Sequence, residues 1–170
     1  ACLGGTFVAL EDVAGFGGDD EGLSAVIPAP TGFALFGNTV TQVRVSSNGF
    51  LTTNLAITDP LAVNGLLDSD PSVSIAPQWD DLGFISVCQK TLSGGRLAVQ
   101  WDGLNFDSGS VVQFQAILDG NGTITFVYGP RHSADGSTAT IGVQGGGNTL
   151  QFGADSPLVG PASSITLTPN

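Results

Sequence analysis

The sequence Ile75-Ala-Pro-Gln-Trp-Asp-Asp-Leu82, followed by Leu97-Ala-Val-Gln-Trp-Asp102, indicates the fold most clearly. Each run contains one of the two tryptophans, and aspartate follows each of them directly. In the second run every other residue from Leu97 to Trp101 is a large apolar one, which is typical of a strand with one buried face. Because a buried tryptophan removes a large apolar area from water, we expect Trp79 and Trp101 to anchor the core.

The second half of the chain repeats this period-2 pattern in two further strands. In residues 112–118 the apolar side chains at 112, 114, 116 and 118 face one way with Gln113 and Gln115 opposite. In residues 124–128 the side chains at 124, 126 and 128 face one way with Thr123 and Thr125 outward. The apolar faces include Phe114 and Phe126. We therefore expect these two rings to be core anchors beside the tryptophans.

Short strands separated by turn residues account for most of the remaining chain. Asn48-Gly49 is the strongest hairpin signal, and it follows a strand in which Val43 and Val45 face inward and Ser46 outward. Residues 54–72 contain prolines and aspartates and are expected to form a long irregular connection. Further strands are expected at residues 6–10, 33–36, 39–47, 50–53, 73–77, 84–89, 139–143, 149–152 and 165–167. About eleven short strands and no amphipathic helix predict an all-β, two-layer antiparallel sandwich, jelly-roll-like, as a single domain over residues 1–170.

The composition argues against nucleic acids and anionic membranes as partners. The 170 residues include 15 acidic and four basic side chains, for a net charge of −11. Such a chain repels phosphate groups, and its few basic residues form no patch in the sequence. Charged residues make up 11% of the chain. The surface must therefore consist largely of Ser, Thr, Asn, Gln and Gly, which is unusual for a cytosolic protein.

Cys2 and Cys88 are the two cysteines and form the one possible intramolecular pair. One interpretation is two buried free thiols. The interpretation we prefer is a disulfide, which would stabilise the fold by about 4–5 kcal/mol in the chain-entropy model. A disulfide is typical of proteins secreted into an oxidising environment.

The start of the chain supports the same location. It begins Ala1-Cys2 with neither an initiator methionine nor an apolar signal segment, so we expect a mature product whose signal peptide has been removed. We expect it to be secreted and to lie outside the cell, at the cell surface or in an extracellular fibre. No apolar run approaches the roughly 20 residues that cross a membrane, so no membrane span is expected.

A series of motifs in the middle of the chain resembles a known family. The series begins with Val45-Ser-Ser-Asn-Gly-Phe50 and Ile75-Ala-Pro-Gln-Trp-Asp-Asp-Leu82, and continues through residues 97–101, 112–119, 123–128 and 139–143. In this order the motifs resemble the NIDO module of nidogen-type extracellular proteins, and secreted bacterial proteins with the same pattern are similar. The similarity covers roughly residues 40–145. It implies an extracellular β-rich module used in matrix or adhesion contexts, with no catalytic residues to carry over.

Candidate metal sites in the sequence are weak. Asp119-Gly-Asn-Gly-Thr-Ile124 resembles the start of a calcium loop, but Ile124 stands where that loop needs glycine and Pro130 where it needs glutamate. A hairpin turn explains these residues without a metal. Asn121 also begins a glycosylation acceptor pattern, and residues 19–21 and 68–70 are acidic loop clusters of the kind that is usually solvated. We expect no metal and no cofactor.

Candidate catalytic residues are equally few. Asp80 and Asp81 are adjacent and would point to opposite faces of a strand, so they are poorly placed to share one substrate, and turn bonding explains them better. His132 is the one histidine, and no Gly-x-Ser-x-Gly elbow accompanies it. We therefore expect no catalytic residues and no enzyme activity.

Two non-catalytic functions remain. We prefer a structural subunit that assembles with copies of itself into an extracellular filament, pilus-like fibre or surface coat, because a low-charge Ser/Thr/Gly surface suits close contact between subunits. The alternative is an adhesion module for carbohydrate or matrix, in which we expect an exposed aromatic ring to stack against sugar. The candidates for that ring are Phe16, Phe84 and Phe106.

Assembly would need a strand that completes the sheet of a neighbouring copy, and two terminal segments qualify. The first is residues 6–10, with Phe7 and Val8. The second is residues 163–168, with Ser163, Ile165 and Leu167. We prefer the second, because it alternates cleanly and follows a proline- and glycine-containing stretch that would let it leave its own domain.

Overall fold

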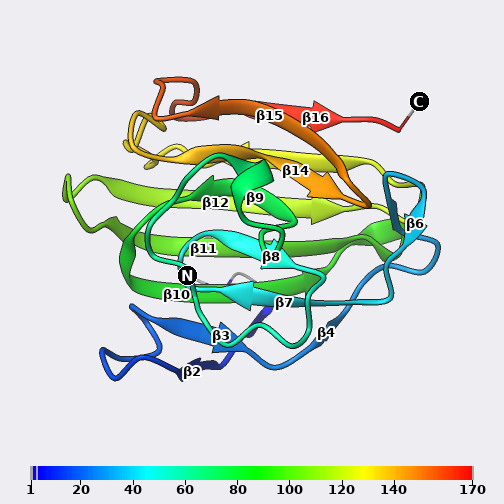
Figure 1. Ribbon diagram of the computed structural model, residues 1–170, viewed down its shortest axis with the longest axis horizontal. Coiled ribbons are helices and arrows are strands. Elements are labelled where there is room, and N and C mark those ends of the chain that lie inside the picture. Colours follow the sequence, from blue (N-terminus) through cyan, green and yellow to red (C-terminus); the bar gives the residue numbers. More distant parts are fainter. Residues whose placement is uncertain (1, 3, 170) are drawn as a thin grey trace.

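Two antiparallel sheets face each other across one hydrophobic core in the computed structural model, which describes residues 2 and 4–169 (Figure 1). The first sheet has six strands in the order β1-β10-β11-β12-β13-β16. Their bounds are β1 Thr6–Phe7, β10 Leu82–Thr91, β11 Leu97–Asn105, β12 Val111–Leu118, β13 Ile124–Tyr128 and β16 Ser164–Leu167. The first and last strands of the chain are therefore the two edges of this sheet.

The second sheet has eight strands, and Figure 1 shows several of them in front of the first sheet. Its order is β15-β14-β9-β8-β7-β3-β2, with β4 paired to β7 beside this path. The bounds are β2 Leu10–Asp12, β3 Gly22–Ser24, β4 Ile27–Pro28, β7 Gln42–Ser46, β8 Phe50–Thr52, β9 Ile75–Trp79, β14 Thr140–Gly145 and β15 Asn148–Ala154. A small hairpin pairs β5 (Ala34–Leu35) with β6 (Asn38–Thr39), and two 3-10 helices span η1 Leu67–Ser69 and η2 Ser93–Gly95.

The prediction of an all-β antiparallel sandwich is confirmed, but the number of strands is wrong. The described residues form sixteen strands instead of about eleven. The predicted strand 6–10 is split into β1 and β2, and β3 is a buried strand for which the sequence analysis predicted none. Several of the additional strands have two or three residues, which is too short for a period-2 pattern to be visible.

The main core lies between the sheets, and Trp101 and Phe114 are at its centre. Both are fully buried, and their rings stack with centroids 5.2 Å apart on the neighbouring strands β11 and β12. The Trp101 indole N–H donates a 2.9 Å hydrogen bond to the Ser46 carbonyl of β7, in the opposite sheet. Phe126 is fully buried in the same cluster. One tryptophan thus joins the two layers by both packing and a directed bond.

Trp79 lies in a second, smaller cluster. Phe50 and Leu51 are adjacent in β8, and Leu51 belongs to the main core while Phe50 packs with Trp79 (ring centroids 6.1 Å apart). Since neighbouring residues of a strand point to opposite faces, this cluster covers the outer face of the eight-stranded sheet. The connection 54–72 covers this cluster and contributes Leu67 to it. The Trp79 indole N–H donates a 2.7 Å hydrogen bond to the Leu61 carbonyl of the same connection.

The hairpin at Asn48-Gly49 is present, but its turn is buried. Gly49 has a positive φ of 80° and would clash with the Gln78 carbonyl if it carried a Cβ, which explains glycine there. Asn48 is fully buried, and its side chain accepts a 3.0 Å bond from the Leu82 N–H. Ser46 was predicted to face outward and is also fully buried, because the connection 54–72 covers it and its hydroxyl donates to the Pro60 carbonyl.

The predicted disulfide between Cys2 and Cys88 is confirmed, with the two Cα atoms 5.6 Å apart. It fastens the N-terminal segment to β10, where Thr6 and Phe7 pair with Gln89 and Cys88. Among the described residues, no helix is long and apolar enough to cross a membrane.

Candidate functional site

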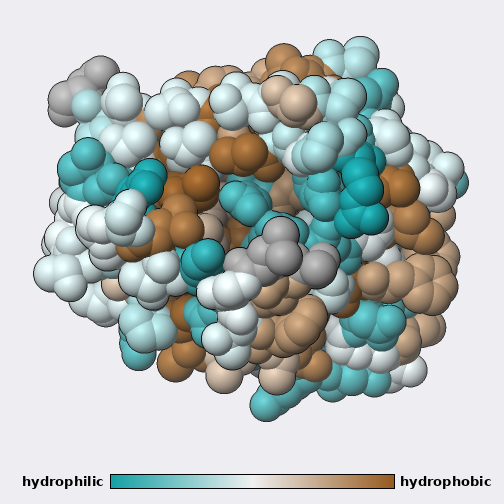
Figure 2. All heavy atoms as spheres, turned by 180° about the vertical axis from the view of Figure 1, so that it is seen from behind, coloured by the Kyte–Doolittle hydropathy of each residue, from teal (hydrophilic) through white to brown (hydrophobic). Residues whose placement is uncertain are grey.

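The outer face of the six-stranded sheet carries a groove of about 630 Å³, which we call the outer groove. Its floor is formed by side chains of β11 and β12. The Cys2–Cys88 disulfide lies on one side of it, and the segment 129–131 lies on the other. Figure 2 shows the molecule from this side, with hydrophilic residues near the centre of the face.

Strand alternation explains the polar floor. In β11 the residues Leu97, Val99 and Trp101 point into the core, so Gln100 and Asp102 point outward. The same alternation in β12 points Gln113 and Gln115 outward. The β11–β12 register then pairs Gln100 with Gln115 and Asp102 with Gln113. The four polar side chains come together because two adjacent strands alternate in phase.

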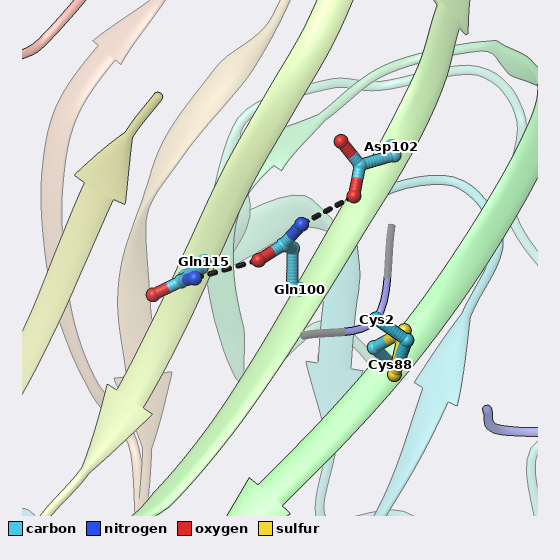
Figure 3. The surroundings of a disulfide bond; sticks show 5 residues. All are labelled: Cys2, Cys88, Gln100, Asp102 and Gln115. Atoms are coloured by element: carbon cyan, nitrogen blue, oxygen red, sulfur yellow. Dashed lines mark hydrogen bonds between the residues drawn. A yellow bond between two sulfur atoms is a disulfide. The ribbon is translucent and has the colours of Figure 1, made fainter. Parts of the chain in front are cut away.

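These side chains form one hydrogen-bonded network (Figure 3). The Gln115 amide donates to Gln100 Oε1 at 2.7 Å, and the Gln100 amide donates to the Asp102 carboxylate. The Gln113 amide donates to the same carboxylate at 3.0 Å. The Arg131 guanidinium lies 3.5 Å from Asp102, with its side chain 67% exposed. We call Gln100, Gln113 and Gln115 the glutamine cluster; Asp102 is the common acceptor that holds it in place.

Acidic side chains form a separate group at the junction of β3 and β10. The carboxylates of Asp20, Glu21 and Asp81 lie within 4.8 Å of one another, and among the described residues this is the group dense enough to hold a metal ion. Burial raises the pKa of Glu21 to about 7, aided by the charges of Asp20 and Asp81 and opposed by a hydrogen bond from Asn48. Without a cation, the protonated form of Glu21 relieves this repulsion.

Asp80 is separated from Asp81 as the sequence suggested. Its carboxylate is buried and accepts bonds from Asn105 Nδ2 at 2.6 Å and from the Thr138 hydroxyl at 2.7 Å. Burial raises its pKa to about 6, although the bonds from Thr138 and the Asp81 N–H lower it. Asp80 joins the end of β9 to the end of β11, whereas Asp81 faces the acidic group. The two carboxylates do not share one site.

These raised pKa values predict that Glu21 and Asp80 stabilise the fold more at about pH 5 than at pH 8, while the lowered pKa of the buried His132 acts in the opposite direction. A carboxyl group whose pKa is higher in the folded chain binds its proton more tightly there, so stability falls as the pH rises from the unfolded to the folded pKa. For Glu21 this window runs from 4.5 to about 7, and for Asp80 from 3.8 to about 6. Urea unfolding midpoints at the two pH values measure the difference.

Glu21→Gln should reduce this dependence on pH, because it removes the group that titrates in the upper part of the window. Glu11→Gln is the control, since it makes the same chemical change at an exposed position of β2. If the urea midpoint falls by the same amount between pH 5 and pH 8 in both variants, general charge repulsion, and not the acidic group, causes the dependence on pH.

His132 is a buried structural residue in the segment that follows β13. It is 1% exposed, its Nδ1 accepts a 3.1 Å bond from the Gln113 N–H, and its ring packs against Phe114 and Tyr128. Burial lowers its pKa. The sequence around this histidine contains no signal for its burial.

The turn 119–122 has the local bonds expected of a hairpin. The Asp119 carboxylate accepts from the Asn121 N–H at 3.2 Å, and the Asn121 side chain accepts from the Thr123 N–H at 2.8 Å. These bonds use the oxygens that a calcium loop would offer to the ion.

The remaining candidate residues lie at the sheet edges and on the surface. Phe7 in β1 is 66% exposed, and Val8 is half-buried beside it and donates its N–H to the Val87 carbonyl. Ile165 and Leu167 in β16 pack against the main core, and the Ser163 hydroxyl donates to the Gly160 carbonyl at 2.7 Å. The three candidate stacking rings are exposed by 74% at Phe16, 72% at Phe84 and 57% at Phe106.

Sequence reasoning missed the outer groove. It placed the glutamines on the polar face of their strands but assigned them no role, because the pairing of β11 with β12 was not part of the prediction. The one available signal was that three of the four outward polar side chains of these strands are amides, whereas a solvated sheet face usually holds charged residues.

Comparison with known proteins identifies a family. A family model described as NIDO related matches residues 3–169. The match is wider than the residues 40–145 that carry the resemblance in the sequence, and it includes both terminal segments. No curated protein and no solved structure gives a significant match.

Proposed function

Since the chain belongs to the NIDO-related family, we propose that it is a secreted, non-catalytic structural protein that assembles with copies of itself into an extracellular filament or coat. The observation that carries the proposal is that β1 and β16 form opposite edges of one sheet. A contact between the β16 edge of one copy and the β1 edge of the next joins different surfaces, so it propagates instead of closing. The family and the disulfide support an extracellular location.

The outward groups of β16 suit such a contact. The Tyr128 N–H donates to the Ser163 carbonyl at 2.9 Å, so this pair of the β13–β16 ladder is a hydrogen-bonded one. Hydrogen-bonded and non-hydrogen-bonded pairs alternate along antiparallel strands. The main-chain groups of Ser164 and Thr166 therefore point to the open edge, while Ile165 and Leu167 hold β16 to its own sheet. The strand can bind a neighbour without leaving its domain.

The opposite edge offers an apolar surface. β1 has two residues and pairs with Cys88 and Gln89 of the ten-residue β10. Next to it, the Val87 carbonyl accepts from the Val8 N–H and the Ile85 N–H donates to the Asp19 carbonyl, so short segments and not one long strand cover this edge. Phe7 on β1 and Phe84 on β10 are both more than 60% exposed. Exposed aromatic residues at a sheet edge are a feature of interaction surfaces.

Thr166→Pro tests this joint. Proline removes the N–H that faces the open edge and leaves the bonds between β16 and β13 in place. We expect few or no fibres by electron microscopy and sedimentation, with an almost unchanged unfolding midpoint. Thr166→Val is the matched control, because it changes the side chain and keeps the N–H, and it should assemble normally.

Fibres of normal length and yield from a folded Thr166→Pro protein would overturn the β16 joint. Absence of any assembly by the unaltered protein, over a range of concentrations and salt, would overturn the structural function itself.

A further inference from the structure

We propose that the outer groove binds a neutral carbohydrate chain through the glutamine cluster. This site is separate from the sheet edges on which assembly would depend, and it does not use the exposed aromatic rings considered above. Its volume of about 630 Å³ lies within the range of small-ligand sites. It is a groove along a sheet face, a shape that suits an extended chain.

The chemistry of the floor matches sugar hydroxyls. A hydroxyl group both donates and accepts hydrogen bonds, and so does an amide side chain. Gln100, Gln113 and Gln115 present three amides within two strands, and among the described hydrogen bonds none ends on Gln115 Oε1. In Figure 3 that oxygen points away from Gln100, across the face of the sheet. It is free to accept a bond from a hydroxyl.

The network also holds the amides in fixed orientations before any ligand arrives. Gln100 both accepts from Gln115 and donates to Asp102, so its side chain is bonded at both ends. Asp102 is held in turn by Gln113 and by the Arg131 guanidinium. Side chains that are already ordered lose little conformational freedom on binding, which favours affinity.

The walls supply the apolar part of a sugar site. Val127 and Pro130 line the groove on one side, and Ala98 lies on its floor. Such groups can cover the C–H faces of a pyranose ring. On the other side the disulfide holds the wall formed by Cys2 and Gly5 against β10.

Charge decides in favour of a neutral ligand. The chain carries a net charge of −11, which repels polyanions at a distance. The groove itself is lined by two basic residues, Lys90 and Arg131. The Arg131 guanidinium is paired with Asp102, and Lys90 is not free either. Amides, which have no net charge, form the recognition surface. An acidic polymer would therefore be a poorer ligand than a neutral one.

Binding can be measured on a glycan array and then by calorimetry with cellohexaose, xylohexaose and chitohexaose as neutral probes and hexagalacturonate as the acidic probe. We expect at least one neutral probe to bind. The double variant Gln100→Leu/Gln115→Leu should bind it at least about tenfold more weakly, because two hydrogen-bonding amides are lost. Gln42→Leu is the control, since Gln42 is an exposed glutamine on β7 of the other sheet.

The unfolding midpoint of each variant distinguishes loss of binding from loss of the fold. A second variant, Gln115→Glu, removes the hydrogen bond to Gln100 without changing the size of the side chain. Three outcomes would overturn the proposal: no binding of any neutral glycan on the array, equal binding by the folded double variant, or binding of hexagalacturonate alone with strong dependence on salt. None of these outcomes bears on fibre formation, so the two proposals are tested independently.

Discussion

Trp101→Ala should lower the free energy of unfolding by about 3–5 kcal/mol, among the largest effects of any single substitution in this protein. The indole is fully buried and stacks on Phe114 at 5.2 Å, so alanine leaves a cavity between the two sheets. The substitution also removes the 2.9 Å bond to the Ser46 carbonyl, which then retains a longer 3.4 Å contact from the Gly49 N–H. Chemical unfolding followed by circular dichroism measures the loss.

Trp101→Phe separates packing from hydrogen bonding. It keeps an aromatic ring against Phe114 and removes the indole N–H, so we expect a smaller loss of about 1–3 kcal/mol. An unchanged midpoint for Trp101→Ala would mean that Trp101 is peripheral, and the account of the core given above would be wrong.

Loss of the disulfide should have an effect of similar size. Cys2 and Cys88 are 86 positions apart in the sequence, and cross-linking so long a loop contributes about 4–5 kcal/mol in the chain-entropy model. We expect a reducing agent to lower the urea midpoint accordingly. The tether also matters locally, because β1 pairs with β10 through two residues and has few other contacts to hold it.

The variant with both Cys2→Ala and Cys88→Ala supplies the control. It should unfold at the midpoint of the reduced protein and should not respond to the reducing agent. Equal midpoints for the oxidised and reduced protein would show that the bridge adds no stability. In the double variant the wall of the outer groove at Gly5 is no longer tethered, so affinity for a neutral glycan should fall as well.

The two proposals are compatible in space. Assembly would use the edges of the six-stranded sheet, β1 and β16, and carbohydrate would lie on its outer face over β11 and β12. A filament that grows edge to edge would therefore leave the groove of each copy accessible, and it would repeat the groove along its length.

Much of the fold was predictable because it depends on local patterns. The alternation in residues 97–101, 112–118 and 124–128 placed the correct side chains inward, and Asn48-Gly49 marked a hairpin that is present. The alternation of apolar and polar residues identifies which side of a strand is buried, because successive side chains point to opposite faces. With two cysteines in the chain, the pairing of Cys2 with Cys88 was also accessible.

Burial by distant segments was not predictable in this way. Ser46 is covered by the connection 54–72, and Trp79 packs under the same connection in a cluster of its own. His132 is buried against Tyr128 and Phe114. In each case the residues that cover the buried side chain come from a distant part of the chain. The sequence pattern around the buried residue therefore could not predict its burial.

The sequence by itself therefore determined the class of fold, the inward face of the long strands and the disulfide, since each depends on neighbours along the chain or on a pair without alternatives. Apart from hairpins marked by their turn residues, such as β7–β8, the tertiary structure decided which strands are neighbours. That choice placed Gln100 beside Gln115, brought Glu21 within reach of Asp81, and made β1 and β16 the edges of one sheet. The physical reason is that sheet order follows from packing two layers around one core, and this packing depends on all the strands together.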